Sequence, residues 1–88
     1  MNTHSIWKYP VEVGEFALRM PKGAQVLDVQ IQGREPVMWA IVDTAAEREV
    51  RRFRIYGTGH PYEVQRDKYI GTFQLDSGSL VFHLFEVL

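Results

Sequence analysis

The strongest constraint on the fold is a side-chain period of two, repeated in short runs that end at glycine or proline. It is clearest over residues 25–32, where Leu27, Val29 and Ile31 share one face and polar residues occupy the other. Residues 7–13 alternate in the same way. This period is typical of a β-strand with one buried and one solvated face. The chain is therefore expected to consist mainly of strands.

The same pattern continues along the chain and predicts an all-β fold. The expected strands are residues 7–13, 15–21, 25–32, 37–43, 50–57 and the two arms of a hairpin over residues 69–87, with its turn at residues 76–78. Residues 25–43 are expected to form another hairpin. Parallel sheets need crossovers of a dozen or more residues, for which this chain has no room. We expect one domain, residues 1–88, folded as a small antiparallel β-sandwich or barrel of about seven short strands.

Three local features refine this expectation. Pro10 has no N–H to donate to a ladder, which predicts an edge strand or a strand that starts beside a bulge. Residues 37–43 are apolar on both faces, as in a central strand, so we expect Trp39 in the core with Trp7 and the phenylalanines. Residues 44–49 are the most helix-like patch, but they are too short for a stable helix. At most one short helical turn is expected.

Composition narrows the class of function. The net charge of −1 provides no field that attracts double-stranded nucleic acid or an anionic membrane, so neither partner is expected. The absence of cysteine excludes a disulfide framework and a cysteine-bound zinc, and favours a reducing cytoplasm. No signal-peptide core and no apolar run near the roughly 20 residues of a membrane span is present. Because 88 residues bury only a thin core, we expect a homo-oligomer.

The strand over residues 50–57 carries the first candidate site. Alternation places Arg52, Arg54 and Tyr56 on one face, opposite Phe53. Two guanidinium groups in a row suit bidentate bonds to phosphate or carboxylate. The alternative is that these arginines only solubilise and protect an exposed strand face and pair with Glu47 or Glu49.

The loop that follows carries the second part of that site. Gly57 and Gly59 permit positive φ and a close approach of backbone N–H groups to a ligand, while Thr58 and His60 offer a hydroxyl and an imidazole. The P-loop ending and its helix are missing, so this is not a P-loop. The alternative is a glycine-rich turn with a structural histidine.

Other reactive residues do not form a recognisable site. His83 lies on an apolar strand face and is expected to be a hydrogen-bonded core residue. The three histidines lack metal-ligand spacing, the serines lack a nucleophile elbow, and the aspartates are scattered. We expect no enzyme, no metal and no cofactor.

Several stretches carry a resemblance to a known family: "KYP", "MPKGAQVLDVQ", "WAIVD", "FRIYGTGH", "YIGTFQ" and "LVFHLFE". Through them the chain resembles short uncharacterised proteins encoded by bacteriophages and prophages. The resemblance implies a small accessory protein expressed in the cytoplasm of the host bacterium. Phage proteins of this size often act against host defence, either by binding an immune protein or by sequestering a nucleotide signal. Such a role comes from analogy with other phage proteins of similar size and not from residues of this chain.

Two hypotheses of function follow. The first is a non-enzymatic protein that binds an anionic or nucleotide-like small molecule through Arg52, Arg54, Tyr56 and the loop over residues 57–60. The second is a protein–protein inhibitor of a host immune factor, or a phage assembly factor, that uses an exposed sheet edge or an aromatic face. A basic groove would favour the first, and a large exposed apolar patch would favour the second.

Overall fold

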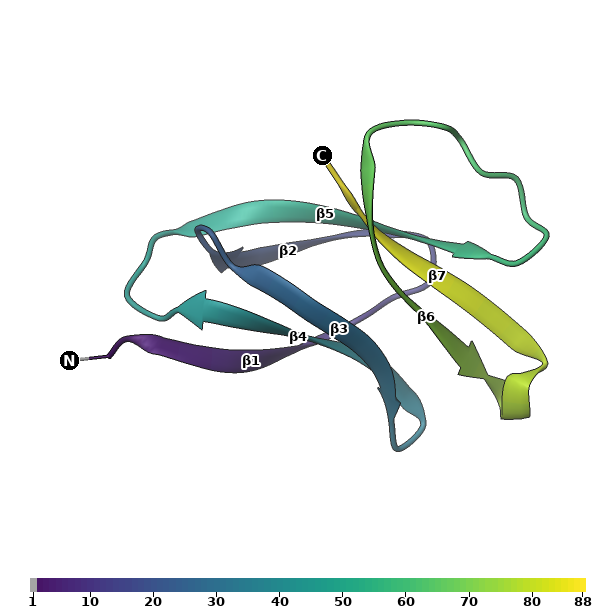
Figure 1. The fold of residues 1–88 in the computed structure, drawn as a ribbon, viewed down its shortest axis with the longest axis horizontal. Coiled ribbons are helices and arrows are strands. Elements are labelled where there is room, and N and C mark those ends of the chain that lie inside the picture. Colours follow the sequence, from purple (N-terminus) through teal and green to yellow (C-terminus); the bar gives the residue numbers. More distant parts are fainter. Residues whose placement is uncertain (1) are drawn as a thin grey trace.

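The computed structural model describes residues 2–88 and shows two antiparallel sheets (Figure 1). The three-stranded sheet has the order β1-β4-β3, and the four-stranded sheet has the order β2-β5-β7-β6. The elements are β1 (His4–Pro10), β2 (Glu15–Pro21), β3 (Gln25–Gln32), β4 (Glu35–Asp43), β5 (Arg48–Gly57), β6 (Asp67–Leu75), the 3-10 turn η1 (Asp76–Gly78) and β7 (Leu80–Val87). The prediction of an all-β fold of short antiparallel strands is confirmed, and the sheets do not close into a barrel.

Local and distant pairings combine in this topology. Both expected hairpins form, β3 with β4 and β6 with β7. The other pairings join segments that are far apart in the sequence: β1 pairs with β4, β2 with β5, and β5 with β7. Among residues 2–88, β1 pairs on one side only, so the edge strand predicted from Pro10 is confirmed.

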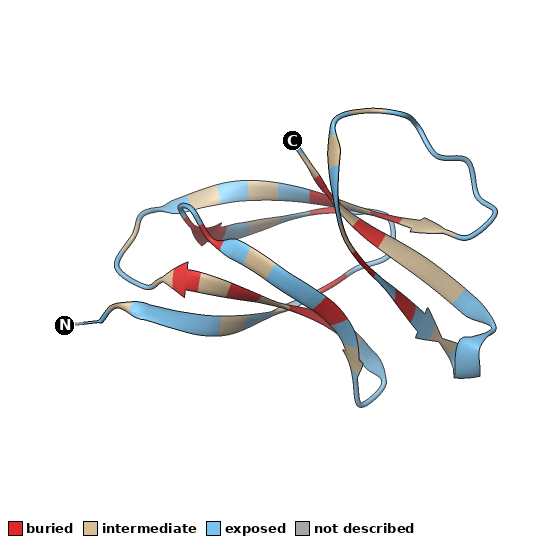
Figure 2. Ribbon diagram, viewed as in Figure 1, coloured by how far each residue is buried: buried red, intermediate tan, exposed pale blue. Residues whose placement is uncertain are grey.

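The shared core lies on the inner faces of the two sheets. Figure 2 shows buried positions on strands of both sheets. Met38 and Val29 contribute from the three-stranded sheet, and Phe53 and Leu84 from the four-stranded sheet; all four are at most 1% exposed. No helix within residues 2–88 has the length and apolar character that crossing a membrane requires.

The sheets approach each other most closely where β6 crosses β3. A Cβ atom on Gly71 would lie 2.8 Å from Cγ1 of Val29 and 3.3 Å from Oδ1 of Asp28. The register of β6 against β7 also shifts between Tyr69 and Gly71. Glycine is therefore required at this crossing, where two strands of different sheets contact each other without pairing.

A β-bulge changes which residues of β3 face the core. The register of β3 against β4 shifts between Val26 and Asp28, which leaves Leu27 unpaired and 42% exposed. Because a bulge inserts one extra residue, the alternation changes face there. Val26 packs against the core in its place, whereas Val29 lies inward as expected. The prediction that Leu27 shares the buried face was wrong.

Two aromatic residues expected in the core lie elsewhere. Trp39 is half-buried and lies on the outer face of the three-stranded sheet, because its neighbours Met38 and Ala40 face inward. Phe85 lies on the outer face of the four-stranded sheet, next to the buried Leu84. Both strands are central in their sheets, but among the described residues no further strand or helix covers these outer faces, and only the loop after β5 places a ring, Tyr62, against Phe85.

The single helical turn also forms in an unexpected place. Residues 44–47 make a non-helical turn, in which the N–H of Ala46 donates to the carbonyl of Asp43 at 3.1 Å. The 3-10 turn η1 instead joins β6 to β7, at the residues predicted to form the hairpin turn. The limit of one short helical turn is confirmed among residues 2–88.

An ion pair that the sequence reasoning missed lies at the inner face of β5 and β7. Nε and Nη2 of Arg51 donate to the Glu86 carboxylate at 2.6 and 2.9 Å, and Nη1 donates to the carbonyl of Ala24 at 2.6 Å. Only 15% of the Arg51 side chain and 11% of the Glu86 side chain are exposed. This contact links β5 and β7 to the turn that precedes β3, and so ties one sheet to the other.

Candidate functional site

The outer face of β5 presents the residues that alternation assigned to it. Phe53 is fully buried and Ile55 is 7% exposed, whereas Arg52 is exposed and Arg54 and Tyr56 are half-buried on the opposite face. The paired strand β7 places Phe85 beside Arg54, and His83 beside Tyr56. The outer face of the four-stranded sheet is therefore the candidate site.

The loop from Gly57 to His60 is a tight turn. The N–H of His60 donates to the carbonyl of Gly57 at 3.1 Å, and Gly59 has a φ of +85° at the third position, as a type II turn requires. A Cβ atom on Gly57 would lie 2.6 Å from Nδ1 of His60, so the imidazole packs against the bare glycine backbone. The geometry of the turn thus explains why glycine occupies both positions, without a ligand.

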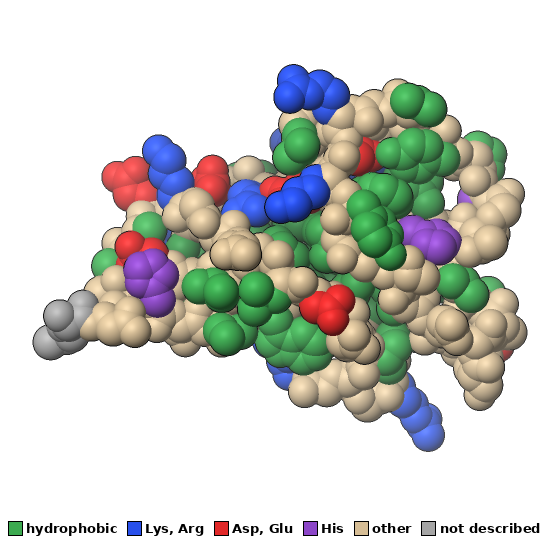
Figure 3. All heavy atoms as spheres, in the orientation of Figure 1, with side chains coloured by type: hydrophobic (Ala, Val, Ile, Leu, Met, Phe, Trp, Pro, Cys, Tyr) green, Lys and Arg blue, Asp and Glu red, His purple; other side chains and the backbone are tan. Residues whose placement is uncertain are grey.

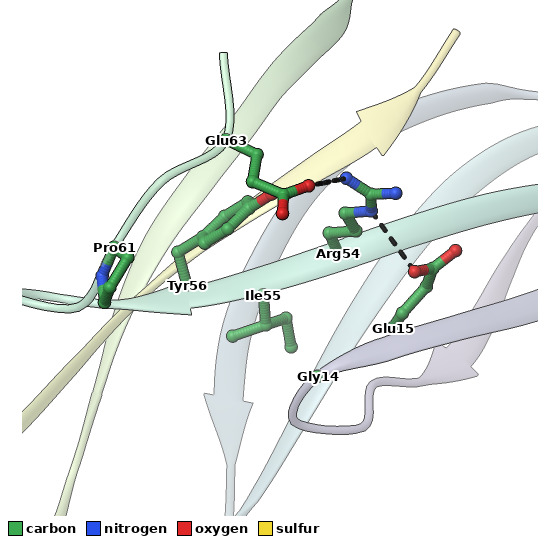
Figure 4. Close-up of a pocket in the computed structure, with 7 residues that line it drawn as sticks. All are labelled: Gly14, Glu15, Arg54, Ile55, Tyr56, Pro61 and Glu63. Carbon is green, nitrogen blue, oxygen red and sulfur yellow. Dashed lines mark hydrogen bonds and ion pairs between the residues drawn. The ribbon is translucent and has the colours of Figure 1, made fainter. Parts of the chain in front are cut away.

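The structure divides the predicted site residues between two hollows. Arg54 and Tyr56 border a groove of about 330 Å³, which we call the Arg54 groove; it is lined by Gly14, Glu15, Arg54, Ile55, Tyr56, Pro61 and Glu63 (Figure 4). Gly57, Thr58 and His60 border another hollow of about 280 Å³, beside residues 79–82. Arg52 borders neither of them.

Arg54 lies between two carboxylates in its groove. Its Nε is 3.3 Å from Oε2 of Glu15, and its Nη1 is 4.0 Å from Oε2 of Glu63 (Figure 4). Nη1 also donates to the Tyr56 hydroxyl at 3.5 Å. Because the carboxylates that line the groove outnumber its guanidinium, the groove is not basic.

Aromatic rings cover the sheet beside the groove. Tyr56, Tyr62, Tyr69 and Phe85 form a connected set, which we call the aromatic face. The ring centroids of Tyr62 lie 4.7 Å from Tyr56 and 5.4 Å from Phe85. Phe85 also contacts Tyr56 at 5.8 Å and Tyr69 at 5.5 Å. In the space-filling view, apolar side chains gather where the loop after β5 meets β6 and β7 (Figure 3).

A chain of hydrogen bonds continues from the aromatic face to the turn. Nε2 of His83 lies 2.8 Å from the Thr58 hydroxyl, and Nδ1 lies 3.0 Å from the Thr72 hydroxyl. The Thr72 hydroxyl in turn contacts the Tyr69 hydroxyl at 2.5 Å. His83 is therefore hydrogen-bonded as predicted, but it lies half-buried on the outer face and not in the core.

The comparison with protein families gave one match. A family model described as "Domain of unknown function (DUF7352)" matches residues 2–88. The chain belongs to the DUF7352 family. No curated protein and no solved structure matched the chain. The matched range includes every strand of this DUF7352 protein, and all residues of the aromatic face and the Arg54 groove.

The surroundings of Tyr62 shift the pKa of its phenol. Packing against its surroundings and, next, the negative charge of Asp67 raise the pKa of Tyr62 above its usual range. The phenol also donates to Oδ2 of Asp67 at 3.4 Å. Tyr62 therefore stays neutral at physiological pH and presents a flat ring with a polar edge.

The outer face of the four-stranded sheet of this DUF7352 protein presents three kinds of chemical group. It combines packed rings, hydroxyl groups that already hydrogen-bond each other, and a guanidinium held by carboxylates. Within residues 2–88, no three His, Asp or Glu side chains are grouped to hold a metal ion. Strand alternation could have placed Tyr56, Tyr69 and Phe85 together on an outward face. Tyr62 lies in a loop, so no alternation pattern could have placed it there.

Proposed function

We propose that this DUF7352 protein is a non-enzymatic binding protein that docks a partner protein on its aromatic face. The observation that carries the proposal is the set of four packed rings on the outer face of the four-stranded sheet, three of them from strands and Tyr62 from the loop after β5. Tyrosine and arginine are enriched among the residues that dominate binding energy in protein interfaces. A ring such as that of Tyr69, which is 56% exposed, supplies a large rigid contact area.

The charges beside the rings favour a partner that presents a basic residue. Glu63 is 86% exposed along its side chain and is only loosely held, at 4.0 Å from Arg54. It is free to receive a lysine or arginine of the partner, whose cation would also lie near the Tyr56 ring. An anionic ligand at Arg54 would instead lie beside the carboxylates of Glu15 and Glu63, which repel it, and this is why we place protein binding first.

The resemblance to phage and prophage proteins supports a biological setting for this proposal. We propose an accessory protein of a bacteriophage that acts in the bacterial cytoplasm, with a host immune factor or a phage assembly protein as its partner. Nucleotide sequestration remains the competing hypothesis, and the experiment below distinguishes the two.

The test compares two substitutions of similarly exposed apolar residues. Tyr69→Ser removes a ring of the aromatic face, whereas Ile6→Ser changes β1, where Ile6 is 61% exposed. Tagged wild type and both variants are purified from the bacterial host, and bound proteins and released small molecules are identified by mass spectrometry. The identified partner is then purified and titrated calorimetrically.

We expect a protein that Ile6→Ser retains and Tyr69→Ser loses, with binding weakened by about 2 kcal/mol or more, roughly 30-fold. Identical protein partners and affinities for all three chains would contradict the proposal. A nucleotide that Tyr69→Ser retains, and that a further variant purified in the same way, Arg54→Ala, loses, would support the competing hypothesis instead.

A further inference from the structure

The second edge strand, β2, leaves part of its backbone unpaired. Among residues 2–88, β2 pairs with β5 alone. The N–H of Ile55 donates to the carbonyl of Gly14 at 2.8 Å, and the N–H of Lys22 donates to the carbonyl of Glu47 at 2.7 Å. In an antiparallel ladder, residues that bond to the partner alternate with residues that do not. The even-numbered residues of β2 therefore bond to β5.

The odd-numbered residues consequently direct their N–H and C=O groups away from the sheet. Glu15, Ala17 and Arg19 are all exposed, and no described segment pairs with them. Met20 and Pro21 are buried, and Pro21 has no N–H, so the free edge ends at Arg19. A free edge of this kind is a template for another strand.

We propose that the free edge of β2 pairs antiparallel with β2 of a second copy of this chain, about a two-fold axis at Ala17. Ala17 then lies opposite Ala17 of the second copy, and Glu15 lies opposite Arg19 of the second copy. By symmetry, Arg19 lies opposite the second copy's Glu15. Each of these pairs exchanges both backbone hydrogen bonds, because all three residues direct their backbone N–H and C=O groups away from β5.

Charge selects this register over its neighbours. Opposite charges directly across two strands are stabilising, and like charges are destabilising. A two-fold axis at Glu15 places two carboxylates face to face, and an axis at Arg19 does the same with two guanidinium groups. An axis at Phe16 or at Leu18 places Glu15 and Arg19 each opposite an uncharged residue. Within residues 2–88, Arg19 takes part in no ion pair, and the Glu15 carboxylate, although 3.3 Å from Nε of Arg54, belongs to a side chain that is 51% exposed and can receive Arg19 of the second copy as well.

The inner face of the strand also fits a second copy. Phe16 and Leu18 point inward, and the register at Ala17 places each opposite the other across the axis. Leu18 is only half-buried in one copy, so it gains an apolar neighbour. The small side chain of Ala17 leaves room for close approach at the axis.

The other free edge does not offer this complementarity. The bonds of Thr44 to Thr3 and of Val11 to Pro36 show that odd-numbered residues of β1 bond to β4, so Lys8 and Pro10 point their backbone outward. The segment His4–Pro10 contains no acidic residue to pair with Lys8. The remaining edges, β3 and β6, lie against each other. The β2 edge is thus the self-complementary one.

Sedimentation velocity from micromolar to millimolar concentration tests the proposal, whatever binds the aromatic face. We expect wild type to shift from a 10.2 kDa monomer to a dimer. Arg19→Glu raises the dissociation constant roughly 10-fold or more, whereas the matched control Arg34→Glu, on the exposed β3–β4 turn, leaves it unchanged. Arg19→Glu mixed with Glu15→Arg forms a heterodimer close to wild-type strength, since each opposing pair is again of opposite sign.

Thermal melts confirm that each variant is folded. Ala17→Pro offers an independent test: it should weaken the dimer, because it removes an N–H at the free edge of β2 without removing a hydrogen bond to β5. A wild type that stays monomeric at millimolar concentration would overturn the proposal. So would a dimer that is indifferent to Arg19→Glu, or a charge-swapped mixture that associates no better than its components.

Discussion

Replacing Glu86 by leucine removes the carboxylate that holds Arg51 at the inner face of the four-stranded sheet. The guanidinium loses bonds of 2.6 and 2.9 Å and stays in a site where 15% of its side chain is exposed. Removal of one partner from a buried ion pair costs about 3–5 kcal/mol. Because both side chains retain some contact with water, we expect the lower end, about 3 kcal/mol, out of a total stability of about 5–15 kcal/mol.

The double variant Arg51→Met with Glu86→Leu separates this cost from simple loss of contacts. It leaves no unpaired charge, and only the carbonyl of Ala24 loses its donor, which held it at 2.6 Å. We therefore expect a loss of about 1 kcal/mol relative to wild type, less than for Glu86→Leu alone. The difference measures the coupling between the two side chains.

Urea denaturation followed by the fluorescence of Trp7 and Trp39 provides the assay. Arg52→Met is the matched control, because Arg52 is exposed on the same strand and should change stability by at most about 0.5 kcal/mol. A loss below about 1 kcal/mol for Glu86→Leu would show that water screens the pair. A double variant as unstable as the single one would refute the role of the unpaired charge.

Three further predictions concern the packing. Gly71→Ala should destabilise the protein by about 1–3 kcal/mol, since its Cβ would lie 2.8 Å from the stiff, buried side chain of Val29; an unchanged urea midpoint would contradict this. Trp39→Ala should cost about 1–2 kcal/mol and not the 3–5 kcal/mol of a buried ring, and a loss in that higher range would place Trp39 in the core. Burial raises the pKa of Tyr9, with the charges of Arg48 and Arg51 acting in the opposite direction. The contribution of Tyr9 to stability is therefore complete below about pH 10 and is lost as the pH rises through the raised pKa, so melting temperatures should fall less steeply above pH 10 for Tyr9→Phe than for wild type.

The strands could be predicted because their signal is local. A period of two is visible within a few residues, and the hairpins need only a turn between neighbouring runs. The bulge at Leu27 leaves no such trace, since it changes face without changing composition. Trp39 was misplaced for another reason: the sequence shows that a strand is apolar on both faces, but not whether a second layer covers the outer one.

The candidate site depended on contacts between distant segments. The arrangement of Arg54 between Glu15 and Glu63 arises because β2 pairs with β5 and the later loop folds back, and neither event has a local signature. Arg51 and Glu86 did carry a signal: each interrupts the apolar face of its strand, with opposite sign. Opposite charges at such positions on two strands could have predicted both the pair and the contact between the strands.

The pairing order also has a consequence in time. Pro21 pairs with Arg48, so no residue of β2 has its partner in β5 until the ribosome has added 27 further residues (48 minus 21). At about 5–20 residues per second, this takes roughly 1–5 s. The β3–β4 hairpin, by contrast, can close within microseconds of its own synthesis. During that interval both edges of β2 are open, so a nascent chain on a crowded polysome can meet a neighbouring copy before its own fifth strand exists.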